Sequence, residues 1–145
     1  MPNISLKILK LDAAATVPRY EHWGDAGLDL FALKHYELPP GDRQLIQTGI
    51  AIELPPHTEA QIRPRSGLAL NHGITILNSP GTIDAGYRGE IGVIVINHSP
   101  IPFTVTAGMK IAQMVIAPVL QVEVERVDAL SASQRGKKGF GSTGL

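Results

Sequence analysis

The sequence contains no cysteine among its 145 residues. This excludes a disulfide framework, a thiolate zinc site and a cysteine nucleophile, and it suits a reducing compartment. The amino-terminal segment lacks the basic stretch and apolar core of a signal peptide, and no apolar run reaches the length of a membrane span. We therefore expect a cytoplasmic protein with no membrane partner.

Net charge is absent as well, because 13 basic and 13 acidic side chains leave a formal charge of zero. Bulk electrostatics therefore gives no reason to expect nucleic acid as a partner, and any anion must be held by a local cluster. Helix signals are scarce. The one plausible helix is short and covers residues 66–71, with Ser66 as its N-cap and Gly73 as its C-terminal stop.

Short apolar stretches separated by 11 prolines and 15 glycines predict strands instead. The expected strands lie at residues 4–8, just before residue 31, and at 45–54, 59–63, 74–77, 91–96, 103–105, 110–119 and 122–127. We predict a single all-β domain over residues 1–145, a jelly-roll-like β-sandwich with one short helix. Residues 1–130 would form the β core and residues 131–145 a flexible C-terminal lid.

The runs at residues 91–96 and 111–119 do not alternate between apolar and polar side chains. Strands of this kind are buried on both faces. In so small a sandwich another subunit is the simplest cover for the second face, so we expect a homo-oligomer.

Residues 78–90 connect two of the expected strands and are too long for a plain hairpin turn. The stretch carries the acid Asp84, the aromatic Tyr87 and the amide Asn78. Catalytic residues favour loops that rigid strands hold in place. We therefore expect a small polar ligand against this stretch, with Asp84 acting on it.

A second candidate segment is Arg65, Ser66 and Gly67 at the start of the expected helix. A guanidinium, a hydroxyl and free backbone N–H groups suit an anion. By itself, this segment fits an ordinary capped helix with a solvated arginine better.

The tail over residues 135–144 combines three cations, two hydroxyls and four glycines around Phe140. A P-loop is excluded, because Ser142 stands where that motif needs lysine and no strand and helix flank the segment. A disordered basic tail explains the lysines and glycines. A lid also explains Phe140, which could stack on a planar ring while Arg135, Ser142 and Thr143 hold phosphates.

Asp29 and Gln113 complete the candidates. Asp29 could hold a magnesium ion through water. Gln113 lies inside an apolar strand and needs a partner, which could be backbone or ligand. The five histidines show no metal-ligand spacing, and we expect them on the surface or in loops.

With these residues identified, the chain resembles the homotrimeric dUTPase family. The likeness extends from Asp25 to Gly144 and includes the family's five motifs in order. They fall at residues 26–30, 64–69, 81–90, 108–114 and 135–144. Any one of them would be weak evidence, whereas five in order are very specific.

The resemblance implies a jelly-roll trimer with three active sites, each assembled from all three chains. It implies hydrolysis of dUTP to dUMP and pyrophosphate with Mg²⁺ on the triphosphate, which removes dUTP from the nucleotide pool and supplies dUMP for thymidylate synthesis. Asp84 would be the base that activates the attacking water. Asp29 would reach the metal through water.

The resemblance also implies binding roles. Residues facing the base and deoxyribose would be Asn78, Thr82, Ile83, Tyr87 and Gly92. Residues holding phosphates would be Arg65, Ser66, Gly67 and Gln113. Residues of the closing tail would be Arg135, Phe140, Gly141, Ser142 and Thr143, with Phe140 stacked on uracil.

The sequence departs from the family pattern in three places. Asp25 stands where many members have serine, Gly86 where many have a second acid, and Met109 and Lys110 replace an acid–arginine pair. Two alternatives share the fold: a dCTP deaminase, and a regulator that binds the nucleotide without turnover. Asp84, Tyr87 and the Gly-Phe-Gly-Ser-Thr tail favour hydrolysis.

Overall fold

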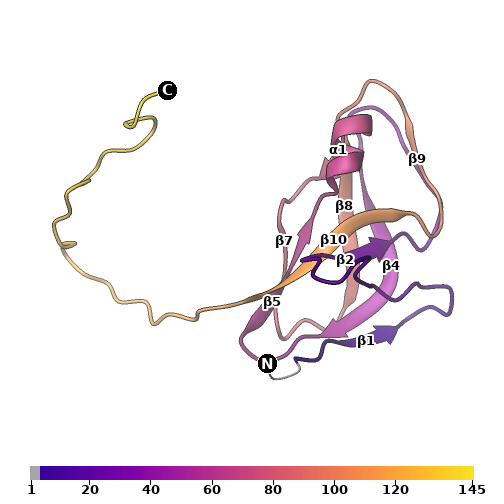
Figure 1. The fold of residues 1–145 in the computed structure, drawn as a ribbon, viewed down its shortest axis with the longest axis horizontal. Helices are drawn as coiled ribbons and strands as arrows, with labels where there is room; N and C mark the ends of the chain where they lie inside the picture. Colours follow the sequence, from indigo (N-terminus) through magenta and orange to yellow (C-terminus); the bar gives the residue numbers. More distant parts are fainter. Residues whose placement is uncertain (1–3) are drawn as a thin grey trace.

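A computed structural model describes residues 4–145; the first three residues, which the predicted domain and its amino terminus include, lie outside the described part. Two four-stranded antiparallel sheets dominate the structure (Figure 1). The first contains, in spatial order, β1 (Lys7–Lys10), β4 (Arg43–Glu53), β8 (Glu90–Asn97) and β6 (Ile74–Ile76). The second contains β2 (Leu28–Phe31), β10 (Lys110–Pro118), β5 (Thr58–Arg63) and β7 (Gly81–Ile83). A small pair, β3 (Tyr36–Leu38) and β9 (Phe103–Val105), and the helix α1 (Ser66–His72) complete the elements.

One hydrophobic core joins the two sheets. Ile46 and Val93 contribute to it from the first sheet, and Leu30, Ile62 and Met114 from the second. Their alternation with less buried neighbours follows from the period of two in a strand, which points successive side chains to opposite faces. The predicted all-β class with one short helix is confirmed, and the packed pair of sheets is compatible with a jelly roll.

The second face of the first sheet is only partly covered. Along β8, buried residues alternate strictly with half-buried ones, among them Gly92 and Ile94. Leu45 of β4, on the strand paired with β8, is 57% exposed. A single chain therefore buries one face of this apolar strand completely and leaves the other face half open.

The N-cap of the short helix is one residue earlier than the sequence suggests. Arg65 occupies the N-cap position with an extended backbone, and Ser66 is the first helical residue. The prediction of Ser66 as N-cap is therefore wrong. Gly73 ends the helix in the left-handed conformation, with φ of 65°, as predicted.

The stretch between β6 and β8 is more than a turn. β6 and β8 pair with each other in the first sheet, as a hairpin requires. Between them, however, the chain crosses to the second sheet, where β7 pairs with β5. The residues from Gly81 to Ile83 thus form a strand of their own, which ends just before Asp84 and which the sequence pattern did not reveal.

The chain leaves the sandwich after β10. The last strand ends at Pro118, Val119 still donates a hydrogen bond to the His57 oxygen at 2.9 Å, and residues 122–145 extend away from the sheets (Figure 1). The strand expected over residues 122–127, within the predicted 1–130 core, is wrong. Its apolar side chains alternate correctly, with Leu120, Val122 and Val124 all exposed, but a strand also needs a partner edge to pair with.

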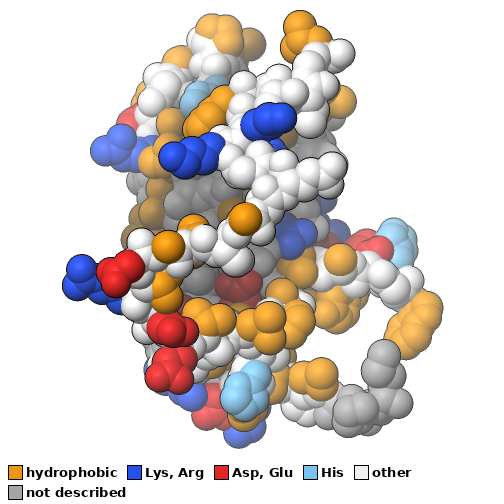
Figure 2. Space-filling view, turned by 90° about the vertical axis from the view of Figure 1, so that its left-hand side faces the viewer, with side chains coloured by type: hydrophobic (Ala, Val, Ile, Leu, Met, Phe, Trp, Pro, Cys, Tyr) orange, Lys and Arg blue, Asp and Glu red, His pale blue; other side chains and the backbone are white. Residues whose placement is uncertain are grey.

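Hydrophobic side chains are also visible among charged ones on the face of the molecule from which the tail leaves (Figure 2). Within residues 4–145, no helix is long and apolar enough to cross a membrane.

Asn97, at the end of β8, is completely buried and ties three segments together. Its amide nitrogen donates hydrogen bonds to the backbone oxygens of Leu38 at 3.0 Å and Ile101 at 2.8 Å. Replacing Asn97 by Ala removes both hydrogen bonds and leaves the Ser99 hydroxyl, at 3.1 Å, as a donor to the Ile101 oxygen, so we expect a loss of about 2–4 kcal/mol in the free energy of unfolding. Urea denaturation measures this loss. Gln44→Ala on the exposed side of β4 is the control, and a similar loss for both variants would contradict the expectation.

Candidate active site

Gln113 is the central residue of β10. In the register of the second sheet it lies opposite Asp29 of β2 on one side and Arg63 of β5 on the other. Its amide nitrogen donates a hydrogen bond to the backbone oxygen of Pro64 at 2.9 Å. The partner that the sequence left open is therefore backbone, and the bond fixes the junction between β5 and α1 against β10.

Gly27 leaves room for this amide. A Cβ atom at Gly27 would lie 2.4 Å from the Oε1 atom of Gln113, so any side chain there would displace it. The loop before β2 can thus approach β10 closely only with glycine at this position.

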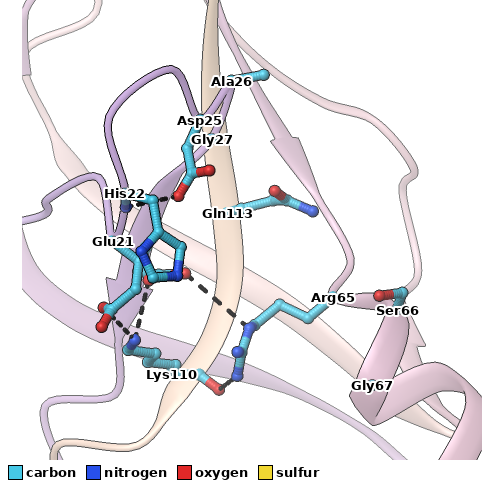
Figure 3. A pocket seen from close by; sticks show the side chains of 11 residues that line it. Glu21, His22, Asp25, Ala26, Gly27, Arg65, Ser66, Gly67, Lys110 and Gln113 are labelled. Carbon is cyan, nitrogen blue, oxygen red and sulfur yellow. Dashed lines mark hydrogen bonds and ion pairs between the residues drawn. The ribbon is translucent and has the colours of Figure 1, made fainter.

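A cavity of about 350 Å³ opens at this end of β10 (Figure 3). We call it the β10 pocket, and its lining residues are Glu21, His22, Asp25, Ala26, Gly27, Asp29, Arg65, Ser66, Gly67, Lys110 and Gln113. The structure thus brings together the four predicted phosphate-binding residues and the predicted metal contact Asp29. Four separate segments supply them: the 19–27 loop, β2, the β5–α1 junction and β10.

Lys110 is the charged centre of the β10 pocket. Its Nζ atom lies 2.7 Å from a carboxylate oxygen of Glu21 and 3.1 Å from one of Asp29. Arg65 lies on the other side of Asp29, with 4.0 Å between Nε and Oδ1, and donates a hydrogen bond to the backbone oxygen of Lys110 at 3.2 Å. Figure 3 shows these groups converging from three segments.

These contacts shift the pKa values of the exposed pair. The hydrogen bond and charge of Lys110 hold the pKa of Glu21 below its usual value of 4.5. The hydrogen bonds that Lys110 donates to Glu21 and then to Asp29 raise the pKa of Lys110 above its usual 10.5. Both groups are therefore charged throughout the neutral range.

The side chains that line the β10 pocket do not carry a net positive charge. Glu21, Asp25 and Asp29 outnumber Arg65 and Lys110, which leaves one net negative charge with His22 neutral. A phosphate chain entering this pocket would need additional positive charge from elsewhere.

A second cavity lies beside β7, in the stretch between β6 and β8. We call it the hairpin pocket, and its lining residues are Leu45, Thr82, Ile83, Asp84, Tyr87, Glu90, Gly92 and Ile94. The structure thus brings together five residues that the sequence analysis selected in this region. Asn78 does not line the cavity; its Nδ2 atom is 3.4 Å from where a Cβ of Gly81, the residue before Thr82, would be.

The turn that carries Asp84 and Tyr87 is fixed from several sides. The backbone N–H of Tyr87 donates to the oxygen of Asp84 at 3.1 Å, and the Tyr87 hydroxyl donates to the oxygen of Glu90 at 2.9 Å. The Tyr87 ring covers Gly89, where a Cβ atom would lie 2.4 Å from the hydroxyl oxygen.

Arg88 reinforces the same turn. Its guanidinium donates hydrogen bonds to the backbone oxygens of Ala85 at 2.7 Å and Tyr87 at 3.2 Å, and it pairs with Glu53 of β4 at 3.4 Å. The exposed Asp84 carboxylate therefore stands on a braced turn and borders a further hollow formed with His57 and Gln121.

The tail does not meet either pocket of the same chain. Residues 140–145 are all exposed, and the Phe140 side chain is 114% exposed. The polar contacts of Arg135 include a hydrogen bond to the backbone oxygen of Lys138 at 2.9 Å, within the tail itself. The predicted roles of Arg135, Phe140, Gly141, Ser142 and Thr143 stay predictions. The five histidines are exposed, as expected.

Comparison with known proteins places the chain in a family. The sequence profile of dUTPase matches residues 13–144. The chain belongs to the dUTPase family.

Several dUTPases are similar over nearly their whole length. The deoxyuridine 5'-triphosphate nucleotidohydrolase of Gloeothece citriformis (strain PCC 7424) is 68% identical over 142 residues, which are 98% of each chain. The enzyme of the same name from Clostridioides difficile is 56% identical over 141 residues, 97% of this chain and 99% of the relative.

Solved dUTPase structures agree with the fold. The dUTPase of Staphylococcus bacteriophage 80alpha with dUpNHpp superposes with a TM-score of 0.91 at 29% identity, covering 97% of this chain and 99% of that one. A mutant dUTPase from phage phi11 of S. aureus, whose structure reveals the coordination of a structural Mg(II) ion, has a TM-score of 0.82 at 25% identity, covering 88% of this chain and 99% of that one.

The structure adds pocket residues to those expected from the dUTPase motifs. Lys110 stands out in the sequence only as a departure from the family pattern, and its position between Glu21 and Asp29 was not predicted. Glu21 carried no local signal at all. It is 89 residues from Lys110 along the chain, so only the tertiary structure brings the two together.

The ion pair predicts a specific titration. We expect the Glu21 carboxylate to titrate below 4.5 and to return to its usual range in Lys110→Met, while Lys138→Met in the exposed tail leaves it unchanged. The pair stabilises the folded 19–27 loop at neutral pH. That contribution is lost as pH falls through the lowered Glu21 pKa, and as pH rises through the raised Lys110 pKa.

Carboxyl-carbon NMR across a pH series measures both transitions. An unshifted Glu21 signal in the unmodified chain would show that the ion pair does not form in solution.

Proposed function

We propose that this protein hydrolyses dUTP to dUMP and pyrophosphate, with active sites shared between the subunits of a homotrimer. The observation that supports the reaction most directly is the near full-length identity of 56–68% to proteins named deoxyuridine 5'-triphosphate nucleotidohydrolase. The reaction removes dUTP from the nucleotide pool and provides dUMP. The cytoplasmic location stays a prediction.

Asp84 is the base in this proposal. Its exposed carboxylate stands on the braced turn at the edge of the hairpin pocket, where a water molecule has access. The carboxylate takes a proton from that water, the water oxygen bonds to the α-phosphorus, and the bond to the bridging oxygen breaks so that pyrophosphate leaves.

The hairpin pocket is the place for the nucleoside. Thr82 and Ile83 offer the backbone groups of a strand end to the uracil edge, with Asn78 nearby and Gly92 on β8 of the other sheet. The Tyr87 ring, held through its hydroxyl and by its packing on Gly89, would lie under the deoxyribose. A ring fixed in this way leaves no room for a 2′-hydroxyl, which gives selectivity against ribonucleotides.

The β10 pocket would hold the phosphates through Arg65, Ser66, Gly67 and Gln113. A magnesium ion fits this donor set in one way. Among residues 4–145, no group of three or more His, Cys, Asp or Glu side chains forms a metal site. Mg²⁺ typically uses one or two carboxylates together with substrate phosphates and water, so Asp29 as a water-mediated contact is sufficient. When bound, the ion would neutralise phosphate charge and orient the triphosphate. The pocket needs such a cation, because its lining residues carry one net negative charge.

Trimer formation is supported by what a single chain leaves incomplete. Leu45, Gly92 and Ile94 of the hairpin pocket lie on the partly covered face of the first sheet. The tail with Phe140 contacts neither pocket of its own chain. A neighbouring copy can cover the open face and supply the tail, so that base, phosphate pocket and lid come from different chains.

The proposed reaction predicts magnesium-dependent pyrophosphate release from dUTP, with much less from UTP, dCTP or dTTP. Asp84→Asn should still bind dUpNHpp but lose about 10²–10⁴-fold in kcat, because the amide cannot accept the proton. A coupled pyrophosphate assay with and without EDTA measures all substrates. An unchanged kcat would remove Asp84 from the base role, and release of ammonia from dCTP would favour a deaminase.

The shared site predicts complementation between two inactive proteins. Asp84→Asn lacks the base, and a chain ending at residue 134 lacks the lid, so each alone should be nearly inactive. Mixed trimers contain sites with an intact Asp84 from one chain and a tail from another. Random mixing in equal amounts should therefore restore about a quarter of the sites.

Activity after joint refolding measures this recovery, and refolding either protein alone is the control. If Asp84 and the tail act within one chain, the mixture stays inactive, since no chain carries both. Size-exclusion chromatography with light scattering shows whether both proteins form trimers.

A further inference from the structure

Two aromatic side chains stand out among residues 4–145 because they are completely exposed: Trp23, at 104%, and Phe140, at 114%. Tyr20 and Tyr87 are about half exposed, and Phe31 is buried. The proposed lid accounts for Phe140. Nothing in the proposed reaction accounts for Trp23, the only tryptophan of the chain.

Trp23 lies at the tip of a short loop at the mouth of the β10 pocket. Its neighbours His22 and Asp25 line the pocket, and Figure 3 shows His22 beside Glu21 and Asp25 next to His22. The loop is closed by two hydrogen bonds, from His22 N to the Asp25 carboxylate at 2.8 Å and from Asp25 N to His22 O at 3.2 Å. The ion pair of Glu21 anchors it to β10. The loop is therefore fixed, and it holds Trp23 in solvent.

Charge distinguishes this loop from the tail. The loop contributes Glu21 and Asp25 to a pocket with one net negative charge. Asp25 stands where many dUTPases have serine, so this chain adds an acid at the pocket mouth. The tail carries three cations, Arg135, Lys137 and Lys138. A bound nucleotide triphosphate makes the pocket more negative still, even with a divalent cation, and so strengthens its attraction for the tail.

We propose that residues 21–25 form the docking surface for residues 135–138 of a neighbouring copy when nucleotide is bound. Trp23 receives the ammonium group of one of the two tail lysines, Lys137 or Lys138, on its ring face, and Asp25 pairs with the other. The tail of the same chain is directed elsewhere, since it leaves from the Pro118 end of β10 whereas the β10 pocket lies at the Lys110 end (Figure 1). This inference rests on the proposed function, because it names the surface on which the proposed lid closes.

The proposed docking surface predicts that loss of the Asp25 charge weakens nucleotide binding, whereas simple charge repulsion predicts that it tightens binding. Removing an acid beside a phosphate pocket should tighten binding of a polyanion. If Asp25 instead pairs with the tail, Asp25→Ser weakens binding of dUpNHpp with Mg²⁺ about three- to tenfold, and Trp23→Ala does the same. Trp23→Phe, which keeps an aromatic face, retains most of the affinity.

A double-substitution cycle tests this in the full-length protein by calorimetry. In a chain with Lys137→Gln and Lys138→Gln, the further change Asp25→Ser should no longer weaken binding, because its partners are gone. Ile101→Ala, an exposed apolar side chain in the β8–β9 turn, is the control and should leave Kd unchanged. Two results would overturn the proposal. One is that Asp25→Ser weakens dUpNHpp binding equally with and without the tail lysines, and the other is that Asp25→Ser tightens binding in the chain that keeps these lysines.

Intrinsic fluorescence gives an independent readout, because the single tryptophan reports only on this loop. Adding dUpNHpp and Mg²⁺ should change Trp23 emission in the full chain and leave it nearly unchanged in the Lys137→Gln, Lys138→Gln chain. Emission typical of a buried tryptophan before nucleotide is added, with no further change, would show that another surface covers Trp23.

The proposed function and the docking surface can fail separately. A chain that releases no pyrophosphate from dUTP refutes the proposed function. A chain that releases pyrophosphate, but shows no coupling between Asp25 and the tail lysines, refutes only the docking surface.

Discussion

The position of β10 between β2 and β5 is the constraint on which the rest of the site depends. Gln113 lies opposite Asp29 on one side and Arg63 on the other, and its amide holds the Pro64 carbonyl at 2.9 Å. In a regular strand Lys110 and Gln113 would point to opposite faces, but the register shift between Lys110 and Ala112 lets both line the same pocket as Arg65. Strand pairing therefore positions Asp29, Lys110 and Gln113, and the 19–27 loop and the β5–α1 junction supply the other lining residues.

Charge balance explains why this pocket cannot work alone. Two cations are already engaged by Asp29 and Glu21, and the lining residues carry one net negative charge. Preformed ion pairs hold Lys110 and Arg65 in position before a ligand arrives, which lowers the entropy cost of binding. They also leave most of the phosphate charge to be neutralised by a divalent cation and by a basic segment from outside the chain. Both requirements follow from the same arrangement of side chains.

The partly covered face of β8 and the projecting tail both expose apolar surface to water in a single chain. An apolar strand with half-buried residues on its second face, and an arm with alternating exposed Leu120, Val122 and Val124, are costly to leave in water. A neighbouring copy can bury both. In that assembly the hairpin pocket, the β10 pocket and the tail can meet at a subunit boundary, which links the proposed catalysis to the proposed oligomer.

The sequence by itself determined the strand-rich class, the place of the short helix and the residues of both pockets that carry recognisable chemistry. Period-two patterns, turn residues and motif spacing are local properties, and they survive in the folded chain. The tertiary structure decided the rest. It paired Glu21 with Lys110 across 89 residues, moved β7 into the opposite sheet, and left residues 122–127 without a strand. Each of these outcomes depends on which distant segment becomes a neighbour, because a strand needs a partner edge and an ion pair needs two side chains brought together by the fold.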